Sequence, residues 1–401
     1  MTAEQRGPLT GVRVLDLGQI YAGGYAGFLL AAAGADVIKV EPPGGENLRR
    51  RGAVGGGAYP FAALNAHKRG VRLDLKTERG REVFRELVST SDVVLENFAP
   101  GVMDRLGLGP DTLREINPRL VYGSVSGYGK EGPYQNYPAM DLTVQAIVGV
   151  MSTTGHPDRA PVKAGPAICD FMAGVHLYAA ITTALYARGV TGRGDVVEVT
   201  MQEATYPALM SSLGLLYAGT NDSGVWRTGN RHSGNAEAPY NVYEAADGYI
   251  AILCVTDNHW QSLAALIGGP ELAADERYVV LAGRVQRMDE LDALVTGWTS
   301  SRKRTDVVSA LQAVRVPCAP VKELPEVMAD ENLRKRGMLR EIEHPELGTL
   351  TVNHSPLLFG DGTRADLAPS PRLGQHTDEV LTEVLGYSQP QLDELRRGEV
   401  I

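Results

Sequence analysis

The sequence predicts an α/β fold: a large domain with a doubly wound open sheet, accompanied by a smaller α/β domain. Two observations support this fold class. Apolar segments of strand length alternate with helical segments from the N-terminus onward, which is the pattern of a parallel sheet with helices on both faces. The chain also has 401 residues, more than one hydrophobic core usually covers, so two domains are expected.

The first segments predict a βαβ unit. We expect a buried strand at Val12 to Leu17, a glycine-rich turn at Gly18 to Gly24, a helix at Ala26 to Ala35 and a second strand at Asp36 to Val40. The two strands of such a unit pair in parallel. The glycines stand at 18, 23, 24 and 27, which is not the GxGxxG spacing of dinucleotide-binding proteins. The sequence therefore favours a structural turn over a nicotinamide or flavin site.

The same alternation continues to the C-terminus. Further strands are expected at Val71 to Leu75, Val93 to Leu95, Leu120 to Ser124, Val196 to Val199, Tyr240 to Tyr243 and Tyr249 to Val255, and helices at Glu78 to Ser89, Leu113 to Asn117, Pro166 to Arg188, Gln202 to Tyr217 and Glu379 to Leu385. The segment Asn221 to Ala238 is rich in Gly, Asn, Ser and Arg and predicts a loop or linker.

Composition excludes several classes of function. The formal net charge is −9, which argues against a nucleic-acid partner. Cys169, Cys254 and Cys318 lie far apart with no metal-ligand spacing, so no metal site is predicted and a reducing cytoplasm fits. No hydrophobic run is expected to reach membrane-spanning length, and the polar N-terminus shows no signal-peptide pattern. We expect a cytoplasmic protein without a membrane partner.

Two basic clusters are candidates for holding a phosphorylated ligand. Lys68, Arg69, Arg72 and Lys76 surround one predicted strand, and Arg49 to Arg51 form the second cluster. Guanidinium and ammonium groups bind phosphate by charge-assisted hydrogen bonds. A solvated surface explains such charge runs equally well, so both interpretations stay open.

Two acidic residues precede apolar helices. Asp170 stands in GPAICDFMAG and Asp141 in YPAMDLTVQA. Each could cap its helix, and each could be an acid of an active site. For Asp170 the functional alternative is a nucleophilic carboxylate in a dry pocket, stabilised by the helix N-terminus. Cys169 is expected to be a core residue.

Eleven segments in chain order together resemble one family. The chain resembles the class III CoA transferases, the formyl-CoA transferase group that also includes α-methylacyl-CoA racemases. The matching segments are LTGVRVLDLGQIYAGGYAG, GADVIKVEPPGG, NAHKRGVRLDLKTERG, DVVLENFAPGVMDRLGLG, INPRLVYGSVSGYG, MDLTVQAIVG, CDFMAG, TGRGDVVEVTMQEA, RTGN, PYNVYEAADGYIAI and PRLGQHTDEVL.

The resemblance implies an activity and a set of site residues. CoA would move from an acyl-CoA donor to a carboxylic acid acceptor through an anhydride and a thioester of Asp170, which matches the family's acyl-carrying aspartate. CoA is then a substrate and product, and no cofactor is bound permanently. Positions that contact CoA in the family match Asp74, Lys76, Thr77, Asn97, Phe98, Ala99 and Arg105; those near the thioester match Tyr21, Met140 and Asp141. We further expect backbone N–H groups at Gly23 and Gly24 to hold the oxyanion.

The resemblance also implies the domain organisation and the assembly. The large domain would comprise residues 1–220, with 340–401 returning to it, and the small domain residues 221–339. Two subunits of the family interlock like chain links, with the active site between them. A homodimer is therefore expected.

Three departures from the family pattern narrow the function. Racemases of the group carry a histidine directly before the acid that matches Asp141, and this chain has Met140. Formyl-CoA transferases carry a glutamine where this chain has Tyr21, and a glycine run where it has NRHSGNAEAPY. A 2-methylacyl-CoA racemase or epimerase and a non-catalytic CoA-binding protein remain as alternatives. The segment NRHSGNAEAPY contains Arg231 and His232, and Arg227 lies just before it. These side chains either bind a second carboxylate or face solvent.

Overall fold

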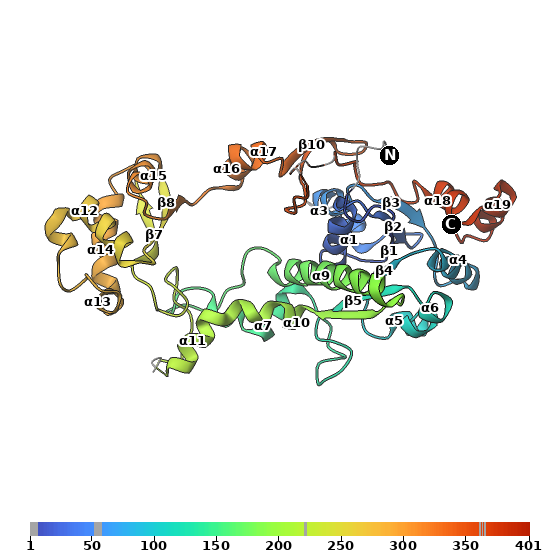
Figure 1. Cartoon of the computed structure of the whole chain (residues 1–401), viewed down its shortest axis with the longest axis horizontal. Helices are drawn as coiled ribbons and strands as arrows, with labels where there is room; N and C mark the ends of the chain where they lie inside the picture. Colours follow the sequence, from blue (N-terminus) through green and yellow to red (C-terminus); the bar gives the residue numbers. More distant parts are fainter. Residues whose placement is uncertain (1–6, 52–57, 220–222, 361, 363, 365) are drawn as a thin grey trace. The chain divides into compact units, whose positions relative to one another are not determined.

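The computed structural model describes residues 7–51, 58–219, 223–360, 362, 364 and 366–401 (Figure 1). The chain divides into two compact units. The first comprises Met1–Val144, Pro166–Thr205 and Met328–Ile401, and the second Gln145–Gly165 and Tyr206–Val327. The chain therefore leaves the first unit twice and returns to it twice. The sequence-based boundaries at 220 and 340 stay a prediction.

The first unit is built on a parallel sheet, which confirms the predicted α/β class. Within the described residues the strand order is β3-β2-β1-β4-β5-β6, and every neighbouring pair is parallel. The strands are β1 (Arg13–Asp16), β2 (Asp36–Glu41), β3 (Arg69–Arg72), β4 (Val93–Glu96), β5 (Val121–Ser126) and β6 (Val196–Thr200). The order reverses between β1 and β4, and ligands of open α/β sheets bind at such a switch point.

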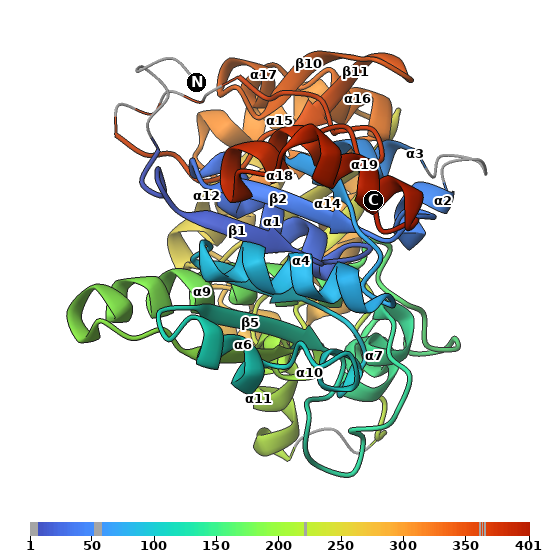
Figure 2. The ribbon, with the colours of Figure 1, turned by 90° about the vertical axis from the view of Figure 1, so that its right-hand side faces the viewer.

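Helices cover both faces of this sheet. The remaining elements of the first unit are α1 (Ala22–Ala32), α2 (Asn47–Arg51), α3 (Ala58–Leu64), α4 (Glu78–Ser89), α5 (Val102–Arg105), α6 (Pro110–Ile116), α9 (Ile168–Thr191), α10 (Met201–Thr205), α17 (Glu331–Lys335), the hairpin β10 (Leu339–His344) and β11 (Gly348–Asn353), α18 (Thr377–Leu385) and α19 (Gln389–Arg397). Figure 2 shows α4 and α18 in front of the strands.

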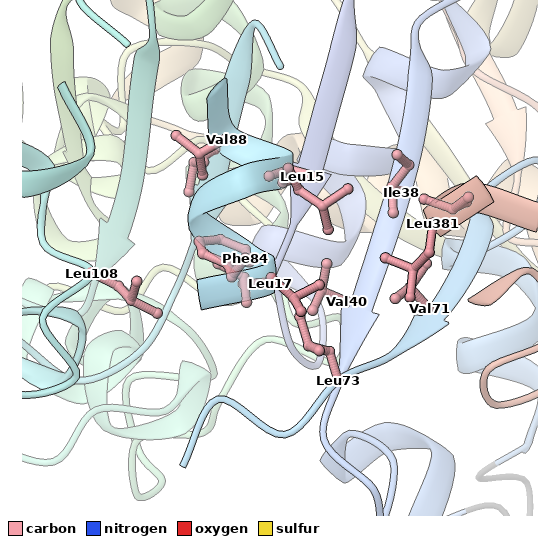
Figure 3. Packing of buried hydrophobic residues seen from close by; sticks show 14 of the residues in the cluster. Leu15, Leu17, Ile38, Val40, Val71, Leu73, Phe84, Val88, Leu108 and Leu381 are labelled. Atoms are coloured by element: carbon pink, nitrogen blue, oxygen red, sulfur yellow. The ribbon is translucent and has the colours of Figure 1, made fainter. Parts of the chain in front are cut away.

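Alternating strand residues assign the helices to opposite faces. Tyr122 of β5 belongs to the cluster packed by α4, α18 and α19, and Figure 3 shows Phe84 of α4 close to Leu15 and Leu17 in this cluster. The next residue, Gly123, approaches Ile181 of α9 so closely that a Cβ would lie 2.8 Å from it. Because successive strand residues point to opposite faces, α9 lies on the face away from α4, together with α1.

The predicted glycine turn is shorter than expected. Strand β1 ends at Asp16 and helix α1 begins at Ala22, so only Leu17 to Tyr21 form the connection between them. Gly23 lies within the first helical turn because the chain folds back on itself there: a Cβ on Gly23 would be 2.7 Å from the Cα of Gly18. Because Gly18 and Gly23 have no side chains, their backbones can come this close, and the connection is a short turn instead of an extended loop.

Helix α9 contradicts one expectation from the sequence. Its 24 residues are long and apolar enough to span a membrane, by length and composition only. A core helix of a globular protein passes the same test. About a third of its apolar window, 33%, is buried, and its contacts are with α1, α10 and the strands β5 and β6. We therefore interpret α9 as a helix of the first unit that packs one side against the sheet and exposes the other.

The second unit is a small antiparallel sheet with helices. Its elements are α8 (Val150–Thr153), the 3-10 turn η1 (Tyr206–Leu209), α11 (Met210–Ala218), β7 (Tyr240–Ala245), β8 (Gly248–Leu253), α12 (Asp257–Ala273), α13 (Leu281–Val285), α14 (Met288–Thr299), α15 (Arg304–Ala313) and β9 (Cys318–Pro320), while α7 (Asp141–Val148) and α16 (Leu324–Met328) cross the unit boundaries. Pro207 interrupts the helix predicted at Gln202 to Tyr217, since proline supplies no N–H to a helix interior.

Candidate active site

A buried ion pair lies beneath the start of α1. The side chains of Asp16 and Lys68 are both fully buried, and Lys68 Nζ lies 2.7 Å from Asp16 Oδ2. Lys68 also donates to the Gly24 carbonyl and to Asn65 Oδ1, each at 3.0 Å. Burial lowers the pKa of Lys68, and the Asp16 carboxylate opposes that shift. Lys68 is thus committed to the fold and is not available to a phosphate.

Some of the remaining basic residues form ion pairs within the fold, and others line a cavity. Arg69 pairs with Asp36 at 2.7 Å and with two acids of α18, and Arg49 forms two hydrogen bonds to Glu41, at 3.0 and 2.7 Å. The phosphate-binding interpretation is therefore wrong for Lys68, Arg69 and Arg49, whose charges are already neutralised. Arg50 and Lys76 line a cavity instead.

This cavity lies at the carboxyl ends of the central strands. It measures about 630 Å³, and four of the expected CoA contacts line it: Asp74, Lys76, Phe98 and Arg105. The other lining residues include apolar side chains, the cations Lys39 and Arg50, and the polar or acidic side chains of Gln19, Glu41 and Glu46; the apolar ones include Leu17, Val40, Leu73, Leu75, Val102 and Leu106. Apolar walls with a few convergent charged groups are typical of a ligand site. The cavity combines cations for phosphate with apolar surface for a heterocycle.

The three remaining expected CoA contacts have structural roles or line a different pocket. Thr77 caps α4: its hydroxyl accepts from the Gly80 N–H at 3.0 Å and donates to the Asp74 carbonyl at 2.9 Å. Asn97 forms hydrogen bonds to the backbone of the β1–α1 loop. Ala99 lines a smaller neighbouring pocket together with Phe98. None of these three lines the large cavity.

The two acids considered for capping have different roles. Asp141 Oδ1 accepts the Cys169 N–H at 2.9 Å and the Asp170 N–H at 3.5 Å, so Asp141 caps the start of α9. Asp170 itself is the third residue of that helix, in its first turn, and the N-cap position is Ala167. Within the described part of the chain, no donor forms a hydrogen bond to the Asp170 carboxylate. Asp141 therefore is a cap, but of α9 rather than of the helix α7 that it begins, and the cap hypothesis is wrong for Asp170.

The environment of Asp170 disfavours its charge. Burial and the nearby Asp141 carboxylate raise the pKa of Asp170 to about 7, while Arg51 acts in the opposite direction. The neighbouring Cys169 is fully buried, and burial raises the pKa of its thiol to about 11. A neutral, buried thiol is a poor nucleophile. The carboxylate of Asp170 is therefore the candidate reactive group of this helix start.

Helix α1 begins beside Asp170. Tyr21 stacks on Phe171, the residue after Asp170, with ring centroids 5.9 Å apart, and Tyr25 meets the same ring at 4.9 Å. Gly174 permits this approach, because a Cβ there would lie 2.8 Å from the Ala22 carbonyl oxygen. The first-turn N–H groups of α1 have no acceptor within the helix. They include those of Gly23 and Gly24, the expected oxyanion donors.

The other expected residues occupy separate positions. Met140 is exposed (57%) directly before α7. In the second unit, Arg231 pairs with Asp289 and Asp292 at 2.6 Å each. Arg227 donates to the backbone carbonyl oxygens of residues 156, 157 and 159, and His232 Nδ1 accepts from the N–H groups of residues 234 and 236. All three side chains hold their own unit together.

Sequence reasoning missed three residues of the first unit. Lys39 is almost fully buried, lines the cavity and donates to the Gly18 carbonyl oxygen. Glu46 and Gln19 also line the cavity. The available signal was a lysine within the apolar strand DVIKVE, because a lysine is rarely buried without a partner.

Together these features define an α/β enzyme: a ligand cavity at the switch point of a parallel sheet and a partly buried carboxylate beside two helix starts. Comparisons with known proteins identify its family. Residues 9–377 match the model of CoA-transferase family III. The chain therefore belongs to CoA-transferase family III, and it is a CoA transferase.

Similar proteins match along almost their whole length. The formyl-CoA:oxalate CoA-transferase of Streptomyces coelicolor is 37% identical over 409 residues, which cover 98% of this chain and 99% of that protein. The succinate–glutarate CoA-transferase of Agrobacterium fabrum is 34% identical, covering 94% and 96%. The crystal structure of a CAIB/BAIF family protein from Brucella suis superimposes with a TM-score of 0.81 at 35% identity, covering 95% of this chain and all of that one, 100%.

Proposed function

We propose that the chain transfers CoA from an acyl-CoA donor to a carboxylic acid through covalent intermediates on Asp170. The observation that carries this proposal is the state of the Asp170 carboxylate. It is partly desolvated and lacks a hydrogen-bond donor among the described residues, while Asp141 satisfies the start of α9. A carboxylate that is not stabilised by donors is a stronger nucleophile than a hydrated one.

The reaction proceeds by exchange of acyl bonds and needs no net proton transfer. An oxygen of Asp170 attacks the thioester carbonyl, the C–S bond breaks, and CoA leaves as a thiolate. The thiolate then attacks the Asp170 carbonyl of the mixed anhydride, which releases the donor acid and leaves an aspartyl-CoA thioester. The acceptor carboxylate reverses these two steps. First-turn N–H groups of α1, at Gly23 and Gly24, would stabilise the tetrahedral oxyanion.

The CoA nucleotide occupies the cavity at the strand ends in this proposal. Lys76 and Arg105 would hold its phosphates, and Phe98 with Asp74 would line the remaining wall; all four line the cavity. Thr77, Asn97 and Ala99 would contribute by shaping the surrounding turns. Tyr21, Met140 and Asp141 would surround the thioester end. CoA acts here as substrate and product.

Hydroxylamine trapping tests the covalent step. Anhydrides and thioesters both react with hydroxylamine to form a stable hydroxamate. Incubation of the protein with an acyl-CoA donor and hydroxylamine should inactivate it and mark the peptide that contains Asp170 by a mass shift. A label on Asp141, or no label during active transfer, would show that Asp170 is not the acyl carrier.

Racemisation of a 2-methylacyl-CoA is the second candidate. A pKa near 7 suits Asp170 to act as a general acid or base. Exchange at an α-carbon with inversion needs a second such group on the opposite side, and this chain offers the thioether of Met140 where the family's racemases have histidine. Little deuterium from heavy water should therefore enter a 2-methylacyl-CoA. Exchange at the rate of turnover would establish the racemase instead.

We also propose a cytoplasmic homodimer. Large apolar side chains are strongly exposed on α9 and α11, where Tyr186 is 79% exposed, Val190 77% and Tyr217 86%. Exposed apolar patches of this kind mark protein interfaces. A second copy of the chain, interlocked as in the family, would cover them.

A further inference from the structure

The connection between β1 and α1 holds a strained residue. Ile20 adopts a φ of 58°, in the left-handed region. This region is unfavourable for L-residues and especially for a β-branched side chain. Such backbone strain persists only where surrounding contacts enforce it, and it concentrates at functional sites. The contacts of Gln19 and Ile20 therefore indicate what the strain is for.

Asn97 enforces this conformation from the end of β4. Its Oδ1 accepts the Gln19 N–H at 2.6 Å, and its Nδ2 donates to the Gln19 carbonyl oxygen at 2.8 Å. One side-chain amide thus binds both polar groups of a single residue. Glu46, which is 2% exposed, accepts the Ile20 N–H at 3.4 Å and the Leu48 N–H at 2.8 Å. We call Asn97 and Glu46 the loop clamp.

The clamped loop lies between the two halves of the site. Gln19 and Glu46 line the large cavity, and Tyr21 at the other end of the loop stacks on Phe171 beside Asp170. The strands that carry the loop and Asn97 are β1 and β4, the pair at which the strand order reverses. A shift of the Gln19 peptide would therefore move the first turn of α1 relative to the Asp170 carboxylate.

We propose that Asn97 is a positioning residue for CoA transfer. Its amide fixes the Gln19 peptide in the strained conformation, and this fixes the α1 N–H groups and Tyr21 at the acyl carbonyl. The family resemblance implies a CoA contact at Asn97, whereas its side chain is already bound to the loop. The proposal rests on the proposed function, because its kinetic test uses the transfer reaction.

Kinetics distinguish a positioning residue from a CoA ligand. Asn97→Ala should lower kcat for CoA transfer by about 10- to 100-fold and leave KM for the acyl-CoA within about threefold. Asn97→Asp, which keeps the acceptor and loses the donor, should fall between this variant and the wild type. A raised KM with an unchanged kcat, or no change in either, would overturn the proposal.

Asn117 provides a matched control. Its Nδ2 donates to the carbonyl oxygens of Val88 and Ser91 at 3.0 and 2.8 Å, and its Oδ1 accepts the Arg119 N–H at 3.0 Å. It also fixes a turn, at the opposite ends of the strands. Asn117→Ala should lower the thermal stability while kcat and KM stay unchanged. An equal loss of kcat in both variants would mean that Asn97 acts only through stability.

A second substitution tests the strain directly. Glycine adopts a positive φ without steric cost. The double variant Ile20→Gly/Asn97→Ala should therefore recover at least a third of the kcat that Asn97→Ala alone loses, and part of the lost Tm. Failure of both to recover would refute the strain argument. Calorimetry of CoA binding is a separate measurement that does not need the transfer reaction. If Asn97→Ala lost CoA binding, Asn97 would be a CoA-binding residue, even if the wild type transfers CoA to no acid. In that last case the proposed function fails, and binding and Tm still decide the role of Asn97.

Discussion

Replacing Asp170 by asparagine should stabilise the protein while it abolishes CoA transfer. The side chain keeps its shape, and the negative charge is lost. In the folded protein, burial and the Asp141 carboxylate raise the pKa of Asp170 from 3.8 to about 7. The folded state therefore binds the proton more tightly than the unfolded state, and the ionised carboxylate costs folding free energy above pH 7.

The size of the effect follows from this shift. One pKa unit corresponds to about 1.4 kcal/mol, so the full shift would cost about 4 kcal/mol. Asp170 is only half-buried, and solvent screening reduces that cost to about 1–3 kcal/mol. The carboxylate also gains about 0.3–1 kcal/mol from the N-terminus of α9, which asparagine gives up. Removal of the charge should therefore still stabilise the protein.

The pH dependence separates this effect from ordinary packing changes. The unfolding free energy of the wild type should fall as pH rises from about 4 to about 8, relative to that of Asp170→Asn. The two proteins should be equally stable near pH 4, and the variant should melt a few degrees higher at pH 8. Thermal unfolding at both values, with transfer assayed in parallel, measures this. A variant that is less stable at pH 8, or that transfers CoA at near wild-type rate, would refute the reasoning.

Three further outcomes are expected. The rate of transfer should rise with pH through about 7, because the nucleophile that we propose is the ionised Asp170; Asp141→Asn removes a neighbouring charge, keeps an oxygen for the cap, and should move that rise to lower pH. Cys169→Ser should retain most of the activity, and a loss of the hydroxylamine label in it would contradict the packing role of the thiol. The dimer should persist on dilution to nanomolar concentration in mass photometry, because interlocked subunits separate only by unfolding; a folded monomer would exclude interlocking.

Periodicity and turn residues were sufficient to predict the parallel sheet. The strands at 13–16, 36–41 and 93–96 were all expected, because central strands of a parallel sheet are continuous apolar runs. The boundary errors arise where tertiary contacts decide. Helix α1 begins earlier than propensity indicates, since Gly23 can approach Gly18 only as a residue without a side chain. A single sequence does not display that contact.

The candidate site was only partly predictable for a related reason. Charge patterns showed where cations gather, but the partners of those cations come from distant segments. Lys68 is neutralised by Asp16 across 52 positions of sequence, and Arg69 by acids more than 300 positions away. Asn97 likewise binds the backbone of a residue 78 positions earlier. Any residue type can offer its backbone as a hydrogen-bond partner, so such partners cannot be recognised from the sequence. Sequence patterns therefore indicate a functional region more readily than the role of each side chain in it.

The different roles of Asp141 and Asp170 show how one helix start can hold an acid that does not cap it. An isolated aspartate at this position would turn toward the free N–H groups of α9 and become a cap, since these donors need an acceptor. Asp141 already accepts from the N–H groups of Cys169 and Asp170, so the Asp170 carboxylate has no such partner and remains available. The same Asp141 charge raises the pKa of Asp170. Two carboxylates in different environments thus differ in role: Asp141 caps α9, and Asp170, which accepts no hydrogen bond from the described residues, is our proposed nucleophile.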